Sequence, residues 1–286
     1  APRSTVNTVC GSPGPGSEPL VTRASLPLLL GDRHADGIGQ ALARRYLTLG
    51  ARLVLVARRV QALQAWVAEQ GEAAARVAVY QADVRDTEAL LAVASRCLAD
   101  HGVPDIVIAN AGVSIGVDLS LVEDLPVLRE LYDTNVLGMA TTFQPFIGPM
   151  AQRGSGTLVG VASVAAARGL PGHAGYCGTK AAVVQMCETL RGELRGRGVK
   201  VVTLTPGYVA TPLTAHNDYP MPFLMDAEDF AARAVPAIER GARFTVIPWP
   251  MGLVYAVLRA LPRGLFDALV GSQKHRKKRR RTEAAD

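Results

Sequence analysis

Residues 53–59 read Leu53-Val54-Leu55-Val56-Ala57-Arg58-Arg59. Five apolar residues in succession, without polar alternation, are typical of a strand that helices cover on both faces, as in a parallel sheet. The two arginines follow directly at the end of the run. Because parallel α/β sheets bind ligands outside the carboxyl ends of their strands, the arginines stand where a ligand would be bound.

Apolar runs of similar length recur along the chain and alternate with helical patterns. Helical spacing is seen in Ile38–Leu49, which Gly50 ends, in Thr87–Asp100 and in Gly175–Arg195. This alternation predicts right-handed βαβ units and a Rossmann-type, doubly wound parallel sheet in a three-layer α/β/α arrangement. The other predicted strands are Leu26–Leu30, Val77–Tyr80, Ile106–Ala109, Leu158–Ala162, Val199–Leu204 and Phe244–Ile247.

A chain of 286 residues is long enough for one large α/β domain, which we place at residues 26–272. Residues 1–25 are rich in Gly, Pro and Ser and are expected to form a flexible extension. Residues 273–286 are expected to form a disordered basic tail. From Lys274 to Asp286 there are seven Lys or Arg and two acids, which leaves 24 bases and 23 acids elsewhere. The tail is either a solvated end or a contact with an acidic membrane surface, and nucleic acid is a less favoured partner.

The four cysteines show no pattern of a metal site. Cys10, Cys97, Cys177 and Cys187 form no C-x-x-C pair and have no ligand spacing with histidine. No signal peptide is visible, and no apolar run reaches the roughly 18 residues of a membrane span. We therefore expect a cytoplasmic protein with free thiols and no metal.

Two features suit a dinucleotide. Gly37-Ile38-Gly39 opens a helix after the first predicted strand, where glycines let the backbone approach a pyrophosphate; the alternative is a tight turn alone. At the end of the second strand an NAD site usually has an acid, whereas Arg58 and Arg59 would suit the 2′-phosphate of NADP. The alternative is a pair of solvated arginines. The sequence therefore favours NADP(H) over NAD(H).

The strongest signal is Tyr176-Cys177-Gly178-Thr179-Lys180, with Ser163 thirteen positions before the tyrosine. The four-residue spacing puts Tyr176 and Lys180 on one face of a helix. A phenol near its reference pKa of about 10 is a poor base at neutral pH, and an adjacent ammonium would stabilise the phenolate. Cys177 points away from this face and is expected to pack.

With these motifs the chain resembles the short-chain dehydrogenase/reductase family from about Gly37 to Thr211. The resemblance also rests on motifs that follow predicted strands or lie in the next helix, namely Asp83, Asn110-Ala111-Gly112, Thr134-Asn135-Val136 and Pro206-Gly207-Tyr208-Val209-Ala210-Thr211. It implies a homodimer or homotetramer.

The resemblance also implies roles for individual residues. Ser163 would bond the substrate oxygen, Tyr176 would exchange the proton, and Lys180 would hold the nicotinamide ribose, with a water on Asn135 in a relay. Asp83 would contact adenine, and Asn110 would steady the central strand. Thr211 and the backbone near Val209 would orient the carboxamide. The remaining cofactor-binding residues that it implies are Val84, Ala111, Gly112, Pro206 and Gly207.

The glycine loop departs from the family pattern T-G-x-x-x-G-x-G. Asp32 and Arg33 stand where Thr and the first Gly belong, and Gly31 can serve as the first glycine only if two residues are inserted. An Asp near a pyrophosphate is unfavourable, so Arg33 would have to offset it. A tolerated loop variant and a reading-frame slip upstream both explain the departure.

After Thr211 the resemblance implies a region that diverges within the family because it shapes the substrate pocket, and two stretches of it are apolar. The stretch 218–225 suits a lid over an apolar substrate, and Trp249 to Leu269 is either core, a pocket wall or a segment that rests on an anionic membrane with the basic tail. His173 is expected in a surface loop, and the alternative is a contact with the substrate. We predict an NADP(H)-dependent oxidoreductase that interconverts a carbonyl and a secondary alcohol on a small apolar substrate. The alternative is a binding or scaffold protein of the same fold with an impaired cofactor site.

Overall fold

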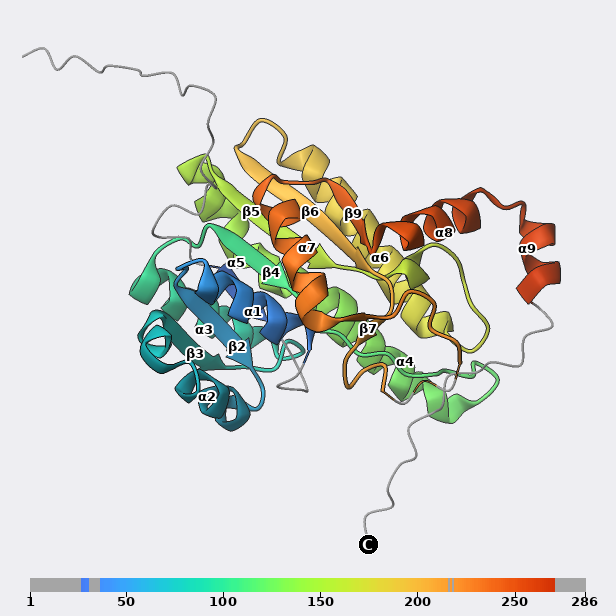
Figure 1. The fold of residues 1–286 in the computed structure, drawn as a ribbon, viewed down its shortest axis with the longest axis horizontal. Helices are drawn as coiled ribbons and strands as arrows, with labels where there is room; N and C mark the ends of the chain where they lie inside the picture. Colours follow the sequence, from blue (N-terminus) through green and yellow to red (C-terminus); the bar gives the residue numbers. More distant parts are fainter. Residues whose placement is uncertain (1–26, 31–36, 216, 218, 271–286) are drawn as a thin grey trace, which may run out of the picture.

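The structure is a computed structural model that describes residues 27–30, 37–215, 217 and 219–270. Seven strands form one parallel sheet in the order β3-β2-β1-β4-β5-β6-β9 (Figure 1). The chain builds outward from β1 to β3 and then crosses back to β4, so the strand order reverses between β1 and β4. The strands are β1 (Pro27–Leu30), β2 (Leu53–Ala57), β3 (Val77–Gln81), β4 (Ile106–Ala109), β5 (Gly156–Val161), β6 (Val199–Pro206) and β9 (Phe244–Ile247).

Each of the seven predicted strands is present, and the differences lie at strand ends. β5 begins at Gly156, two residues before the predicted start. β6 continues to Pro206 because its last four residues pair with β9, and Pro206 stands opposite Ile247. Proline lacks the N–H that a strand interior needs, so β6 ends there. The predicted doubly wound parallel sheet is confirmed.

Residue alternation along the central strands divides the core into two layers. Leu53 and Leu55 pack with helices α1 (Ile38–Thr48), α2 (Val60–Ala68) and α7 (Ala227–Glu239). Val54 and Val56 pack on the opposite face with α3 (Thr87–His101), α5 (Gly138–Arg153) and α6 (Ala174–Glu193). Both sets are apolar because both faces of the sheet are covered, which explains the continuous apolar run at 53–57. The three-layer α/β/α arrangement is therefore confirmed.

Three predicted helices are present as α1 (Ile38–Thr48), α3 (Thr87–His101) and α6 (Ala174–Glu193). The others had not been delimited in advance: α2 (Val60–Ala68), α4 (Leu125–Tyr132), α5 (Gly138–Arg153), α7 (Ala227–Glu239), α8 (Trp249–Ala260), α9 (Arg263–Val270), the 3-10 turns η1 (Gly71–Arg76), η2 (Val122–Asp124) and η4 (Val164–Ala166), and the π-helical turn η3 (Asp133–Leu137).

The region after β6 begins with β7 (Val209–Ala210), which pairs with β8 (Met225–Asp226), and ends with α8 and α9. Figure 1 shows α8 and α9 extending from one side of the sheet. Among the described residues, no helix combines the length and the apolar character needed to cross a bilayer. The predicted N-terminal extension and basic tail lie outside the described residues.

Candidate active site

A cleft opens at the carboxyl ends of the strands, beside the reversal of strand order. It holds about 1390 Å³, counting its open mouth, and brings together most of the predicted site residues from six separate segments. This is the position that a doubly wound sheet favours for a ligand. The predicted residues that line it are Gly37, Ile38, Gly39, Arg59, Asn110, Gly112, Ser163, Tyr176, Lys180, Pro206, Gly207, Val209 and Thr211.

Ser163 and Tyr176 form the centre of the cleft. Ser163 follows β5 and caps η4, where its Oγ accepts a hydrogen bond from the amide of Ala165 at 3.2 Å. Tyr176 lies in the first turn of α6 and is partly buried. Burial raises the pKa of Tyr176 to about 12, and a hydrogen bond with the Ser163 side chain opposes this rise. At neutral pH the phenol is therefore protonated and can donate a proton to an oxygen in the cleft.

Lys180 lies one turn after Tyr176 and is buried. Its Nζ donates to the carbonyl oxygen of Val161 at 2.9 Å, and burial lowers the pKa of Lys180 to about 8. The sequence predicted that the Lys180 ammonium would stabilise the phenolate of Tyr176, and this stays a prediction. Desolvation dominates the pKa of Tyr176, and the contact of the ammonium is to the end of β5.

Asn135 was predicted to hold a water in a relay to Lys180, which stays a prediction, and the structure shows its protein partners. It is buried in η3, where its Oδ1 accepts from the amide of Val113 at 2.8 Å and its Nδ2 donates to the Val113 carbonyl at 2.9 Å and to Thr179 Oγ1 at 3.0 Å. Thr179 in turn donates to the carbonyl of Tyr176 at 2.8 Å. Asn135 does not line the cleft, because its amide ties the segment after β4 to helix α6. It is a positioning residue, and a π-helical turn at such a place is common near functional sites.

The two glycines at the start of α1 have different reasons for being glycine. A Cβ on Gly39 would lie 2.7 Å from Asn110 Nδ2, so the close approach of α1 to the end of β4 excludes a side chain. A Cβ on Gly37 would meet no described atom within 4 Å, because Gly37 faces the open cleft. Gly37 is also the N-cap of α1 and makes no side-chain cap, so backbone groups at this helix end are accessible to a ligand. Gly31, Asp32 and Arg33 lie outside the described residues.

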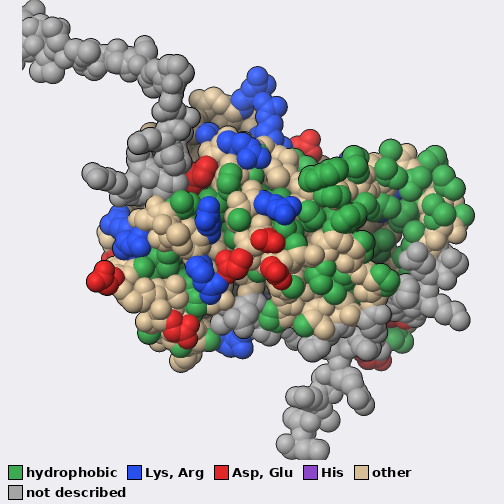
Figure 2. Space-filling model, viewed as in Figure 1, with side chains coloured by type: hydrophobic (Ala, Val, Ile, Leu, Met, Phe, Trp, Pro, Cys, Tyr) green, Lys and Arg blue, Asp and Glu red, His purple; other side chains and the backbone are tan. Residues whose placement is uncertain are grey.

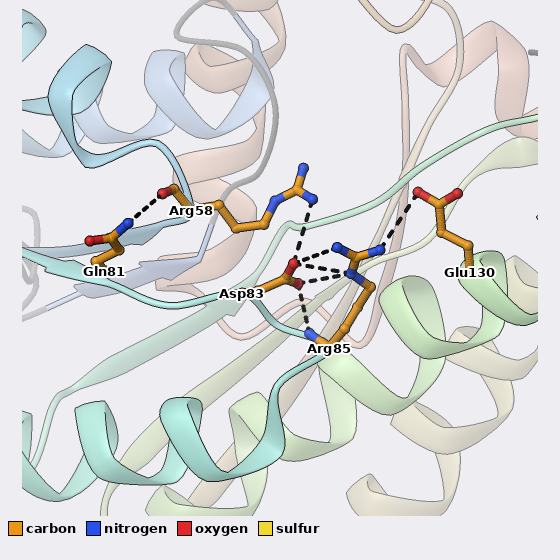
Figure 3. Close-up of polar contacts among 5 residues, drawn as sticks. All are labelled: Arg58, Gln81, Asp83, Arg85 and Glu130. Carbon is orange, nitrogen blue, oxygen red and sulfur yellow. Dashed lines mark hydrogen bonds and ion pairs between the residues drawn. The ribbon is translucent and has the colours of Figure 1, made fainter. Parts of the chain in front are cut away.

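The two arginines after β2 are not equivalent. Arg59 is exposed and lines the cleft, whereas Arg58 forms an ion pair with Asp83 at 3.5 Å (Figure 3). Arg85 also binds Asp83, at 2.6 Å, and approaches Glu130 at 4.0 Å (Figure 3). Burial acts to raise the pKa of Asp83, but hydrogen bonds from Arg85 and the charges of both arginines hold it below its usual value. Asp83 is thus an ionised carboxylate neutralised by arginines.

Asp83, Val84 and Ala111 were predicted to bind cofactor but do not line the cleft. Val84 is buried against the start of α5. The contact is close, since a Cβ on Gly138 would lie only 2.9 Å from the Val84 side chain. Ala111 packs against the core cluster on the same face of the sheet. Both residues support the segments that carry the site, since strand-end motifs include core positions as well as lining positions.

The segment after β6 lines the cleft opposite α1. Thr214, which the motif did not include, donates to the Val209 carbonyl at 2.6 Å and accepts from the Thr211 amide at 3.1 Å, and so holds the turn. The S/T-x-x-T spacing of residues 211–214 was the available signal for this turn. Other lining residues missed from the sequence are Gln40, Leu63, Trp66 and Leu213.

The prediction that His173 lies in a surface loop is wrong. His173 is buried, and its Nδ1 lies 3.0 Å from the carbonyl of Pro171. Its ring packs edge-on against Tyr219, which also contacts Tyr208. His173 is therefore covered by Tyr219, which lies 46 positions later in the sequence. The local sequence around His173 could not predict a contact over that separation. Cys97, Cys177 and Cys187 are buried free thiols, as predicted, and Cys10 lies outside the described residues.

Comparison with known proteins agrees with this site. Residues 33–220 match the family model described as short chain dehydrogenase. An uncharacterized oxidoreductase of Myxococcus xanthus is 38% identical over 236 residues, which are 82% of this chain and 92% of that protein. A D-threitol dehydrogenase of Mycolicibacterium smegmatis is 34% identical over 182 residues, 63% of this chain and 68% of that protein.

Among solved structures, an alcohol dehydrogenase from the archaeon Thermococcus sibiricus, complexed with 5-hydroxy-NADP, is 25% identical. It superposes with a TM-score of 0.68 over 78% of this chain and 96% of that chain. The chain therefore belongs to the short-chain dehydrogenase family and is an oxidoreductase of that family.

Proposed function

We propose that this protein is an NADP(H)-dependent oxidoreductase that interconverts a carbonyl group and a secondary alcohol on an apolar substrate. The observation that carries the proposal is one cleft that holds a protonated phenol, a serine hydroxyl and a buried lysine at one end and an exposed arginine at the other. The relatives support it through a named dehydrogenase and an alcohol dehydrogenase with an NADP derivative bound.

The residues present fit a dinucleotide. The open space at Gly37 and the uncapped start of α1 suit a pyrophosphate. Lys180 and Thr211 line the same cleft and would hold the nicotinamide half. When bound, the nicotinamide would supply or accept the hydride. Ser163 would donate a hydrogen bond to the substrate oxygen, and Tyr176 would protonate that oxygen during reduction or take its proton during oxidation.

The pKa of Tyr176 bears on the direction of the reaction. A pKa of about 12 keeps the phenol protonated at neutral pH, which suits donation to a carbonyl oxygen. Oxidation needs the phenolate, whose fraction rises about tenfold for each pH unit below that pKa. We therefore expect the rate of alcohol oxidation to rise as the pH is raised from about 7 toward that pKa.

Arg59 would bind the 2′-phosphate of NADP. It is exposed and lines the cleft at the carboxyl end of β2, and a guanidinium can donate two charge-assisted hydrogen bonds to a phosphate. Arg58 would contribute less than Arg59 to binding the 2′-phosphate, because Arg58 already forms an ion pair with Asp83.

Titration of the whole chain with NADPH and NADH by calorimetry, followed by turnover on a panel of acetophenones and cyclohexanones, tests the proposal. Tyr176→Phe should bind NADPH nearly as the original protein does but lose turnover, because only the transferable proton is removed. Tyr132→Phe removes a phenol hydroxyl from an exposed tyrosine and is the matched control. If Tyr176→Phe retains more than about a tenth of kcat, the activation free energy has risen by less than about 1.4 kcal/mol, and Tyr176 is excluded as the acid. No detectable binding of either cofactor would favour a binding protein with an impaired cofactor site.

A further inference from the structure

Helices α8 and α9 carry an exposed apolar surface. Trp249, Leu253 and Val257 follow one another at four-residue spacing on one side of α8, and Leu265 and Leu269 do the same on α9. These five side chains are between 51% and 71% exposed, and we call them the C-terminal apolar face. Figure 2 shows hydrophobic side chains gathered over these two helices, with few charged groups between them. Large aliphatic and aromatic side chains repeated in this way indicate a surface that contacts something apolar.

The opposite sides of the two helices are held to the domain. Met251, Tyr255 and Phe266 are buried. Arg168 donates from Nε to the carbonyl of Leu258 at 2.9 Å and from Nη2 to the carbonyl of Leu261, and its guanidinium lies 5.1 Å from the ring centre of Phe266. These contacts fix the inner sides of the two helices to the domain, so that the C-terminal apolar face points to solvent.

The sequence that follows α9 is strongly basic. Between Lys274 and Asp286 it contains seven Lys or Arg and two acids, and α9 ends only four residues before Lys274. An apolar helix surface with a tryptophan next to a polybasic segment is the combination that anionic lipid surfaces bind, since the side chains enter the interface and the bases meet lipid headgroups. We propose that the C-terminal apolar face docks this protein onto the surface of an anionic lipid bilayer, a partner that the charge of the sequence after α9 favours.

A second copy of the chain fits this surface less well. Two copies joined through the C-terminal apolar face would bring two segments of seven bases each to the same interface, and like charges close together disfavour association. Anionic lipid instead supplies the opposite charge over a wide area.

The apolar face has a defined border. Across a cavity from Trp249 lie Phe223 and Leu224, and the same cavity is lined by Asp226, Asp229 and Arg233. Carboxylates would be repelled by anionic headgroups, so we place the border of the docking surface at Trp249. The docked helices would remain attached through Arg168 to the segment between Ser163 and Tyr176. The proposal does not depend on the reaction that the cleft performs.

Flotation of the full chain with vesicles tests the proposal. Vesicles of phosphatidylcholine with 30% phosphatidylglycerol should bind the protein at least tenfold more tightly than pure phosphatidylcholine, and 0.5 M salt should weaken this binding. Leu253→Asp should reduce binding to anionic vesicles at least tenfold. Replacing the seven bases of residues 274–281 with Gln should have an effect of similar size. Leu91→Asp changes another exposed leucine, on α3, and should leave binding unchanged.

Sedimentation equilibrium of the same variants tests the alternative that a second copy of the chain covers the C-terminal apolar face. If Leu253→Asp changes the oligomeric state and leaves vesicle binding intact, the face is an interface between copies and the proposal is wrong. Equal binding to neutral and anionic vesicles, or loss of binding with Leu91→Asp as well, would also overturn it. Circular dichroism of each variant confirms that the fold is retained.

Discussion

Replacement of Asn135 by alanine should destabilise the fold by about 3 kcal/mol. The change removes three hydrogen bonds, two of which satisfy the amide and the carbonyl of Val113. Val113 is buried, so both backbone groups would be left without partners and away from water. A buried polar group without a partner costs about 1–3 kcal/mol, and relaxation recovers part of the sum for two such groups.

Urea unfolding followed by circular dichroism measures this change. Thr179→Val provides the comparison, because it removes the bond from Asn135 and the bond to the Tyr176 carbonyl but leaves Val113 satisfied. It should cost about 1 kcal/mol. The double variant should be less destabilised than the sum of the two, since the bond between the two side chains can be lost only once. If Asn135→Ala lies within 1 kcal/mol of the original protein, or if the two changes are additive, Asn135 is not the tie between Val113 and α6.

Three further predictions follow from the cleft. Raising the pH from about 8 to about 11 should lower the free energy of unfolding of the original protein by about 1.4 kcal/mol more than that of Tyr176→Phe. A pKa raised from 10 to about 12 gives stability that is present below pH 10 and lost toward pH 12; equal losses for both proteins in urea unfolding would contradict it. Gly39→Ala should lower stability by about 1 kcal/mol and weaken NADPH binding, because the new Cβ would displace Asn110, whereas Gly37→Ala should leave stability unchanged; the opposite order in thermal unfolding would refute the packing argument. Arg59→Ala should weaken NADPH about tenfold or more while NADH is little affected, and Arg58→Ala should do less; equal losses for both cofactors in calorimetry would show that Arg59 does not bind the 2′-phosphate.

The parallel sheet could be predicted because its signal is local and repeated. Each strand between two helix layers must be apolar on both faces, so residues 53–57 and 106–109 read as continuous apolar runs. That Ser163, Tyr176 and Lys180 line one cleft could be predicted for a related reason. Tyr176 and Lys180 lie on one helix, where four-residue spacing fixes their relation, and Ser163 stands at the end of a strand that the pattern already placed.

What the sequence could not indicate is which motif residues face the cleft and which support it. Arg58 and Arg59 are neighbours with the same charge, yet Asp83, 25 positions away from Arg58, takes one of them and leaves the other exposed. His173 was similarly misplaced because Tyr219, which packs against it, lies 46 positions away, and the Val113 partner of Asn135 lies 22 positions away. A polar side chain chooses between solvent and a buried partner only once the fold has brought that partner near.

Two side chains that line no part of the cleft connect its centre to the rest of the molecule. Asn135 fixes the segment after β4 to α6, and Arg168 fixes the segment between Ser163 and Tyr176 to α8 and α9. Both make several bonds to backbone carbonyls or amides, so each holds a segment without depending on which side chains that segment carries. A change at Arg168 should accordingly alter the C-terminal helices and substrate binding more than it alters cofactor binding at Gly37 and Arg59.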